Sequence, residues 1–431
     1  MQRREFLITA AIGSSASAIG CTTYAPESTG QPGQPITAPN VPAAVSALKP
    51  MTAGVVPIAV DERRARIAKA QSLMERERLD AIFMEGTASC FYYAGMRWGQ
   101  SERTFGLVIP AKGDVAYVCP GFEEDRAREL IKPEFGTEVR TWQEDESPYA
   151  IIASIVKDRG IRYHRIGMEE RVRFFIADGV RKAAPGMEIA DATAVTAGCR
   201  MIKSPAEIAL LKRSNDVTIA AYRAALTTLA DGLAQNELAH TISAAFDALG
   251  YPGEASVQFG KWTALPHGSA TPQKLKSGDI VMIDGGTTVE GYQSDITRTT
   301  VFGTPTARQR DVWQIEQQAQ AAAFAAMMLG APCESVDAAA RKVIEDAGFG
   351  PGYKTPGLPH RTGHGIGLEY HEWTNFVKGN KTPMAAGMCF SDEPMIAIPG
   401  EFGIRLEDCV YFDEAGAHFF TTPSESIEKP V

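Results

Sequence analysis

The sequence contains few cysteines, and their spacing excludes several kinds of site. Seven cysteines are spread over 431 residues, and none forms a Cys-x-x-Cys pair. A disulfide scaffold and a thiolate zinc site are therefore not indicated. Cys389 and Cys409 flank a predicted hairpin, so a bridge between them is one interpretation, but small buried apolar side chains are the simpler one.

The chain also lacks a block of positive charge. Its net charge is −9, and the lysines and arginines are dispersed along the sequence. This distribution argues against a nucleic acid as the main partner. The hydrophobic content of 44% is typical of a globular protein, and 431 residues are enough for two domains.

Residues 1–21 lack a run that is apolar and long enough for a comfortable membrane span, and they have the pattern of an export signal. Arg3 and Arg4 form a twin-arginine pair, and the run that follows to Gly20 is short and rich in small residues. Residues 18–21 resemble a lipobox, in which the cysteine becomes lipidated. We therefore expect an exported protein, periplasmic or membrane-anchored, with a lipid anchor at Cys21.

Composition divides the remaining chain into three segments. Residues 22–57 are rich in Pro, Ser, Thr and Gly and carry almost no charge, which is typical of a flexible linker. Residues 58–197 alternate helix and strand patterns and indicate an α/β domain, and residues 198–431 form a second domain. The elements predicted for the α/β domain are helices at 61–77, 122–132 and 147–158, strands at 80–84 and 165–169, and a hairpin of 104–110 with 114–118.

A helix-capping pattern marks the start of the second domain. Ser204 has the position of an N-cap, Pro205 that of the first helical residue, and Glu207 completes a capping box. We expect a long helix from there to about residue 229 and another at 235–249.

Two aspartates in the second domain require an explanation. An apolar run at 281–283 ends at Asp284, and Asp295 follows on what is predicted to be the adjacent strand, after a turn at Gly285 and Gly286. Two carboxylates that meet after buried strands repel each other and lose hydration, and a shared metal ion would offset both costs. The alternative is two unrelated turn aspartates, which are common.

Other segments supply further ligands for such a metal. His364, Glu393 and Glu407 are the candidates, and turn residues at Pro399–Gly403 predict a hairpin that brings the two glutamates to one spot. Four carboxylates and one imidazole suit two divalent ions such as Mn²⁺, Co²⁺ or Zn²⁺. Arg405 lies on the same strand face as Glu407 and is expected to hold a ligand carboxylate.

These motifs resemble those of the creatinase/prolidase metallopeptidases, which share the pita-bread fold. The resemblance covers about residues 59 to 425 and rests on Arg200-Met-Ile-Lys-Ser-Pro, Ile-Asp-Gly-Gly, Ser-Asp-Ile-Thr-Arg-Thr, Thr-Gly-His-Gly-Ile-Gly, Asp-Glu-Pro and Gly-Ile-Arg-Leu-Glu-Asp. It implies a creatinase-like α/β N-terminal domain followed by an α+β pita-bread catalytic domain. The branch of Xaa-Pro dipeptidases and Xaa-Pro aminopeptidases is favoured, although Met395 stands where those enzymes usually have glycine.

The resemblance also implies roles for individual residues. The metal ligands fall on Asp284, Asp295, His364, Glu393 and Glu407, and the substrate-side histidines fall on His267, His360 and His371. Two bound ions, with Mn²⁺ the first expectation, would lower the pKa of a water molecule toward neutrality. We expect Glu393 to shuttle the proton, His371 to stabilise the oxyanion, and His267 and His360 to shape the pocket after the scissile bond.

Two other functions stay open at this level. One is a lyase on the same scaffold that acts on a small zwitterion such as dimethylsulfoniopropionate, because a fold does not fix a function. The other is a non-catalytic binding module, which the complete ligand set disfavours. The lead prediction is a dinuclear metallopeptidase for Xaa-Pro bonds, acting on peptide N-termini or on dipeptides and, as is common in the family, forming a homodimer.

Overall fold

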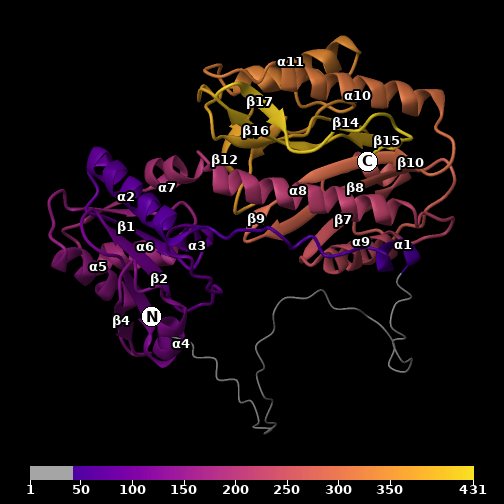
Figure 1. The fold of residues 1–431 in the computed structure, drawn as a ribbon. Coiled ribbons are helices and arrows are strands. Elements are labelled where there is room, and N and C mark those ends of the chain that lie inside the picture. Colours follow the sequence, from indigo (N-terminus) through magenta and orange to yellow (C-terminus); the bar gives the residue numbers. More distant parts are fainter. Residues whose placement is uncertain (1–41) are drawn as a thin grey trace, which may run out of the picture. The chain divides into compact units, whose positions relative to one another are not determined.

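The computed structural model describes residues 42–431 (Figure 1). The predicted export signal, Cys21 and residues 22–41 lie outside this part of the chain. Within residues 42–431, none of the helices combines the length and apolarity needed to cross a membrane. The six cysteines of this part are buried and free, which agrees with their simpler interpretation as small apolar residues.

Residues 42–57 do not have the character of a flexible linker that their composition predicted. Helix α1 (Ala43–Ser46) buries Val45 against the helices α8 and α9 of the second domain. The Met51 N–H also donates to the Leu249 carbonyl at 2.9 Å. A few apolar side chains therefore fix this segment, because they find an apolar surface that local composition cannot reveal.

The N-terminal domain is a mixed six-stranded sheet covered by helices on both faces. The strand order is β4-β3-β2-β1-β5-β6, with β2 antiparallel to both of its neighbours and the other pairs parallel. The strands are β1 (Ala81–Glu85), β2 (Gly106–Pro110), β3 (Ala116–Pro120), β4 (Glu138–Trp142), β5 (Arg165–Met168) and β6 (Glu188–Asp191). The helices are α2 (Val60–Glu77), α3 (Ala88–Ala94), α4 (Glu124–Leu130), α5 (Pro148–Asp158), α6 (Phe174–Ala183) and α7 (Thr193–Arg200).

Alternation along the strands explains the two helical layers of this domain. On β1, Ile82 and Met84 join a core with α2 and α3, whereas Phe83 joins a separate core with α5 and α6. Successive side chains of a strand point to opposite faces, so a strand that is apolar throughout needs cover on both sides. All the helices and strands predicted for this domain are present, with ends that differ by up to two residues.

The second domain places helices around three sheets. The sheets are β10-β8-β7 with β9 attached to β8, β12-β11-β13-β16-β17, and the pair β14-β15. The strands are β7 (Gly253–Phe259), β8 (Ile280–Val289), β9 (Tyr292–Gln293), β10 (Ile296–Val301), β11 (Gly363–Gly365), β12 (Glu372–Phe376), β13 (Cys389–Asp392), β14 (Met395–Ile398), β15 (Phe402–Arg405), β16 (Asp408–Asp413) and β17 (Gly416–Phe419). The helices are α8 (Pro205–Leu226), α9 (Gln235–Leu249), α10 (Ala307–Ala325) and α11 (Glu334–Asp346).

Two helix pairs cover the two sides of these strands. Helices α8 and α9 pack on β7 and β8, while α10 and α11 contact β13, β14, β15 and β12 (Figure 1). The predicted capping box starts α8, because the Glu207 N–H donates to Ser204 Oγ at 3.2 Å and the Ser204 N–H donates to Glu207 Oε2 at 2.9 Å. The strands that will carry the site thus lie between two helical layers.

Candidate active site and metal centre

The two aspartates come from neighbouring antiparallel strands. Asp284 lies within β8, and Asp295 directly precedes β10, which pairs with β8 so that Thr297 lies opposite Asp284. Both carboxylates line one cavity of about 530 Å³. The adjacent strands predicted for this stretch are present, but the turn between them lies elsewhere.

Gly285 and Gly286 allow close packing of strands and do not form the predicted turn. Strand β8 continues through them, and a Cβ on Gly286 would lie 2.0 Å from the Ser294 carbonyl oxygen. The chain reverses at Glu290 and Gly291, whose φ angles of 50° and 95° suit a two-residue type I′ hairpin. The role of this glycine pair is therefore steric, although in the sequence it looks the same as a turn signal.

The other predicted ligands come from the ends and centres of short strands. His364 is the middle residue of β11, and its backbone N–H donates to Ser391 Oγ at 3.0 Å. The predicted glutamate hairpin is present as β14 and β15, with Glu393 just before it and Glu407 just after it. The short hairpin explains how two residues far apart in sequence reach one site.

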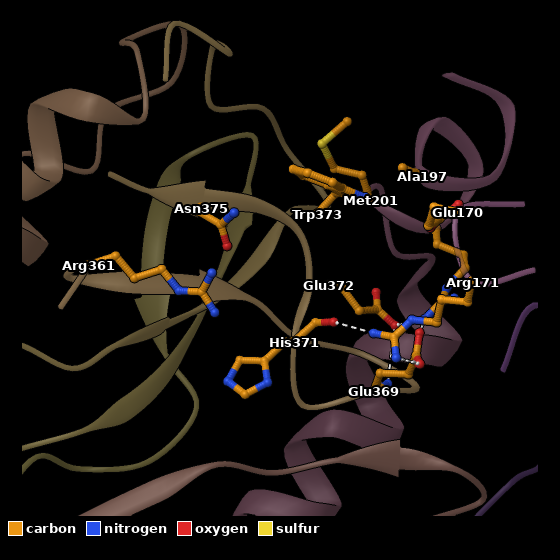
Figure 2. Close-up of a pocket in the computed structure, with 11 residues that line it drawn as sticks. Glu170, Arg171, Ala197, Met201, Arg361, Glu369, His371, Glu372, Trp373 and Asn375 are labelled. Carbon is orange, nitrogen blue, oxygen red and sulfur yellow. Dashed lines mark hydrogen bonds and ion pairs between the residues drawn. The ribbon is translucent and has the colours of Figure 1, made fainter. Parts of the chain in front are cut away.

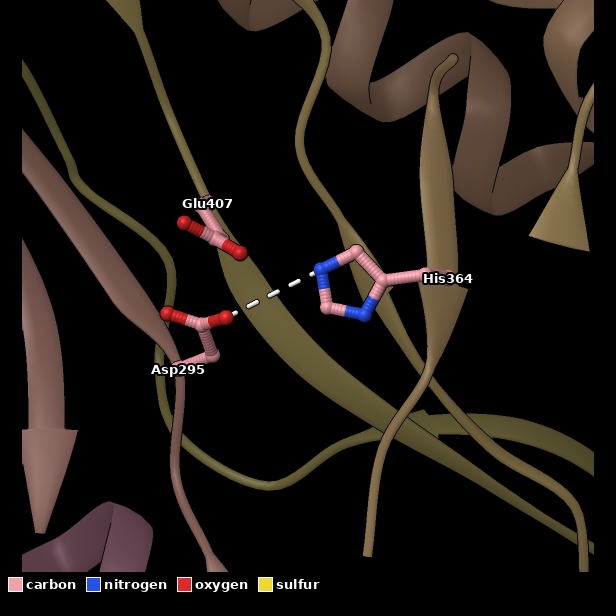
Figure 3. A group of neighbouring side chains, drawn as sticks. All are labelled: Asp295, His364 and Glu407. Atoms are coloured by element: carbon pink, nitrogen blue, oxygen red, sulfur yellow. Dashed lines mark ion pairs between the residues drawn. The ribbon is translucent and has the colours of Figure 1, made fainter. Parts of the chain in front are cut away.

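These five side chains meet in the cavity, which we call the ligand cavity (Asp284, Asp295, His364, Glu393 and Glu407). Asp295, His364 and Glu407 each offer a ligand atom within 4.8 Å of the others (Figure 3). His364 Nε2 lies 3.7 Å from Asp295 Oδ2 and 3.0 Å from Glu393 Oε1. All the predicted ligands are therefore brought together.

The electrostatics of the ligand cavity fit a bound cation. Burial and the neighbouring Asp284 raise the pKa of Asp295 to about 8. Burial and Asp295 raise the pKa of Glu407 well above its ordinary value, and Glu407 Oε1 is buried without a hydrogen-bond partner. An unpaired buried carboxylate is costly, and divalent ions would remove that cost. Four carboxylates and one imidazole form a donor set that suits Mn²⁺, Co²⁺ or Zn²⁺.

Arg405 and Thr297 hold these carboxylates in place. Arg405 forms an ion pair with Asp284, as predicted, and its Nε donates to Thr297 Oγ1 at 3.0 Å. The Thr297 hydroxyl lies 2.9 Å from Asp284 Oδ1 and 2.6 Å from Glu407 Oε2, so it donates to one of the two. Thr297 is a site residue that the motifs did not single out, and its place two residues after Asp295 was the available signal.

Two of the three predicted substrate-side histidines line the ligand cavity, and the third, His360, is close enough to feel the charge of Glu393. His267 and His371 line the cavity, and the ring of His371 meets that of His364 edge-on at 4.3 Å between centroids. His360 Nε2 is buried without a partner, and burial lowers the pKa of this histidine. Burial and the neighbouring His364 lower the pKa of His371 to about 4. A neutral His371 carries one ring N–H, which can donate to a carbonyl oxygen.

A second buried cluster of charge lies behind the turn that carries His371, and we call it the junction network (Arg200, Lys203, Glu369 and Glu372). Arg200 Nη2 lies 2.7 Å from Glu369 Oε2 and also pairs with Glu372. Lys203 Nζ lies 3.0 Å from Glu372 Oε2. Arg200 and Lys203 belong to the motif at the domain junction, but no sequence signal identified Glu369 or Glu372 as their partners.

Comparison with known proteins decides the family. Residues 209–414 match the model of metallopeptidase family M24, and residues 66–202 match that of the creatinase/prolidase N-terminal domain. An uncharacterized peptidase of Schizosaccharomyces pombe is 37% identical over 385 residues, which cover 84% of this chain and 82% of the relative. The chain belongs to metallopeptidase family M24.

Two further proteins are similar to this chain over almost their whole length. The Xaa-Pro dipeptidase of Lactobacillus helveticus is 28% identical, with 84% of this chain and 97% of that protein covered. The crystal structure of dipeptidase PepE from Mycobacterium ulcerans has a TM-score of 0.80 at 32% identity and covers 86% of this chain and 99% of its own. Membership of M24 confirms the predicted metallopeptidase class, the creatinase-like N-terminal domain and the pita-bread catalytic domain.

Proposed function

We propose that this M24 enzyme hydrolyses Xaa-Pro dipeptides with two divalent metal ions, Mn²⁺ being the first choice. The supporting observation is the single cavity that gathers five candidate ligands with His267 and His371. When all four ligand carboxylates are ionised, the one charge of Arg405 leaves three negative charges among them, which a single dication does not neutralise. The similar protein of Lactobacillus helveticus is named Xaa-Pro dipeptidase, which favours proline after the scissile bond.

The residues of the cavity divide the work of hydrolysis. Bound divalent ions would supply Lewis acidity and a water molecule that ionises near neutral pH. Glu393 Oε1 is fixed by His364 at 3.0 Å and by the Ser391 hydroxyl at 3.1 Å. Glu393 is thus oriented to take a proton from the attacking water and pass it to the leaving nitrogen. The neutral His371 donates a hydrogen bond to the scissile carbonyl oxygen as negative charge develops there.

An unpaired arginine supports dipeptides as substrates over longer peptides. Arg361 is half-buried, lines a cavity of about 330 Å³ next to His371, and has no side-chain partner among residues 42–431. The side chains of Arg361 and Asn375 point into the space beside the His371 ring (Figure 2). A guanidinium in this position offers a counter-charge to the free carboxylate of a dipeptide, whereas a longer peptide would place a neutral amide there.

The experiment is a substrate panel with matched metals. Purified protein is stripped with a chelator, reloaded with Mn²⁺, Co²⁺ or Zn²⁺, and assayed on Ala-Pro, Ala-Pro amide, Ala-Pro-Ala and dimethylsulfoniopropionate. We expect metal-dependent cleavage of Ala-Pro and weaker cleavage of the amide and the tripeptide. Arg361→Met should reduce kcat/KM for Ala-Pro by about 10-fold or more and leave the value for the amide unchanged.

Other outcomes contradict the proposal in different ways. No cleavage of any Xaa-Pro bond with any of the metals would exclude an Xaa-Pro peptidase, and turnover of dimethylsulfoniopropionate would then favour the lyase. Equal cleavage of Ala-Pro and Ala-Pro-Ala by both the wild type and Arg361→Met would favour an aminopeptidase. Glu393→Gln is the matched inactive control in each assay.

We further propose that the enzyme is exported through its twin-arginine signal, anchored by a lipid on Cys21, and active as a homodimer. The sequence pattern at residues 1–21 supports export and the lipid anchor. The homodimer is expected because dimers are common in the family. Mass spectrometry of the mature N-terminus checks the lipid, with Cys21→Ser as the variant expected to leave the membrane fraction. Light scattering of the soluble part checks the dimer.

A further inference from the structure

His371 has few contacts of its own that would hold its ring in place. The imidazole is partly exposed toward the ligand cavity and makes no side-chain hydrogen bond among residues 42–431. Its one close ring contact is the edge-on meeting with His364. The position of this imidazole is therefore set by the backbone turn at 366–371 that joins β11 to β12.

The carboxylate of Glu372 lies against the backbone of this turn. Its Oε1 accepts hydrogen bonds from the Leu368 N–H at 2.8 Å and the Glu369 N–H at 3.3 Å. A Cβ on Gly367 would lie 2.6 Å from Glu372 Oε2, so the turn closes tightly around this carboxylate. On the far side, the Gln293 N–H donates to the Gly367 carbonyl at 2.7 Å, which joins the turn to the strand just before Asp295. The turn is thus shaped around one buried anion.

The domain junction supplies the cations that fix Glu372. The side chains of Arg200, Lys203 and Glu372 are 6%, 1% and 4% exposed. Although burial opposes ionisation, Arg200 and Lys203 lower the pKa of Glu372 to about 2. Arg200 Nη1 also donates to Ser89 Oγ at 3.1 Å, so this guanidinium is held by the N-terminal domain as well.

A second arginine of the N-terminal domain touches the same turn. Arg171 Nη2 donates to the His371 carbonyl at 3.3 Å, and Arg171 Nη1 lies 3.0 Å from Glu369 Oε1 (Figure 2). The backbone of the catalytic histidine is therefore in direct contact with the α/β domain. None of these contacts involves one of the five candidate metal ligands.

We propose that Arg200, Lys203 and Glu372 are positioning residues for His371, so that the domain junction sets the place of this imidazole in the reaction. The inference rests on the proposed function, in which His371 donates to the scissile carbonyl oxygen. Loss of a charge in the network leaves a buried partner unpaired, and the turn relaxes to expose it. A small displacement of the imidazole then removes its hydrogen bond in the transition state, while the metal ligands stay in place.

The test is a double-mutant cycle on the metal-loaded enzyme. Glu372→Gln should lower kcat for Ala-Pro by about 10- to 100-fold, with metal content unchanged and KM changed by less than about threefold. In a His371→Ala background, the same Glu372→Gln change should have no further effect, because the residue it positions is gone. Lys203→Arg keeps the charge and should retain most of the activity. Arg310→Met, which breaks only an exposed pair with Glu428, is the control that should leave kcat unchanged.

An equal loss of kcat in both backgrounds would show a merely structural role and overturn the inference, as would full activity of Glu372→Gln. Modification of His371 by diethylpyrocarbonate, followed by mass spectrometry, gives a measurement that needs no substrate. We expect faster modification in Glu372→Gln, or in Lys203→Met if the first variant does not fold, and an unchanged rate overturns the inference. A wild type that cleaves no Xaa-Pro bond would contradict the proposed function, and the labelling would still decide the positioning role.

Discussion

The ligand cavity and the junction network both bury carboxylates, but only the ligand cavity has an excess of negative charge. In the ligand cavity, the four candidate ligand carboxylates face one arginine, and burial raises the pKa of Asp295 to about 8. In the junction network, two carboxylates face Arg200 and Lys203, which lower the pKa of Glu372 to about 2 although burial opposes them. Burial is common to both, so the difference lies in the supply of cations by the protein.

This difference separates a structural cluster from a functional one. A buried ion pair whose members satisfy each other holds chain segments together and needs nothing further. A buried group of carboxylates with an orphan oxygen, such as Glu407 Oε1, is costly until a cation from solution completes it. The excess of negative charge, more than the presence of acids, distinguishes the candidate metal centre.

The largest effect is expected from removal of a ligand. Glu407→Ala should lower metal-dependent kcat/KM by about 1,000-fold or more, because the ligands act as one unit. The assay is Ala-Pro hydrolysis at saturating Mn²⁺, with metal content measured on the same sample. Substantial activity in this variant would contradict the assignment of the cavity as the metal centre.

Metal binding should stabilise the protein through the ligand cavity alone. A ligand present at about 1,000 times its Kd adds about 4 kcal/mol to the free energy of unfolding. Thermal unfolding with and without Mn²⁺ should therefore show a clear rise in Tm for the wild type and almost none for Glu407→Ala. Without metal, Glu407→Ala should cost little stability, since it removes a buried carboxylate whose Oε1 has no hydrogen-bond partner. Strong destabilisation of metal-free Glu407→Ala would show that the ligand cavity, like the junction network, stabilises the protein without metal.

Loss of a cation from the junction network should destabilise the protein whether or not metal is bound. Lys203→Met leaves Glu372 short of one partner and should lower the free energy of unfolding by about 3 kcal/mol or more, with or without metal. Chemical denaturation of the metal-free and metal-loaded forms measures this change. A loss seen only in the metal-loaded form would mean that the network belongs to the metal centre.

The sequence predicted the ligand cavity better than the junction network, for a physical reason. Asp284, His364 and Glu407 each sit in a short motif with turn glycines or strand alternation that can be recognised locally. Arg200 and Glu372 are 172 residues apart, and nothing near either one indicates the other. The turn at Gly285 was predicted wrongly because a glycine that allows close packing looks the same in sequence as one that allows a reversal.

Acid should weaken the junction network through protonation of Glu372. The pKa of Glu372 is about 2 in the folded protein, below its ordinary value of 4.5, so its contribution is present above about pH 4.5 and is lost as pH falls toward 2. That shift corresponds to about 3 kcal/mol. The free energy of unfolding measured from pH 6 to 3 should fall more steeply for the wild type than for Glu372→Gln. Parallel curves would mean that Glu372 keeps the same pKa in the unfolded chain.

The smallest effect is expected from an exposed pair with similar geometry, and it tests whether burial is the deciding variable. Lys342 Nζ lies 2.7 Å from Asp346 Oδ2, but the two side chains are 74% and 65% exposed, whereas Lys203 is 1% exposed. Water screens the exposed pair, and either partner is well hydrated alone. Lys342→Met should therefore leave Tm unchanged within error in the same experiment in which Lys203→Met lowers it by several degrees. Similar losses in the two variants would show that contact distance, and not the lack of solvent around Glu372, gives the junction network its strength.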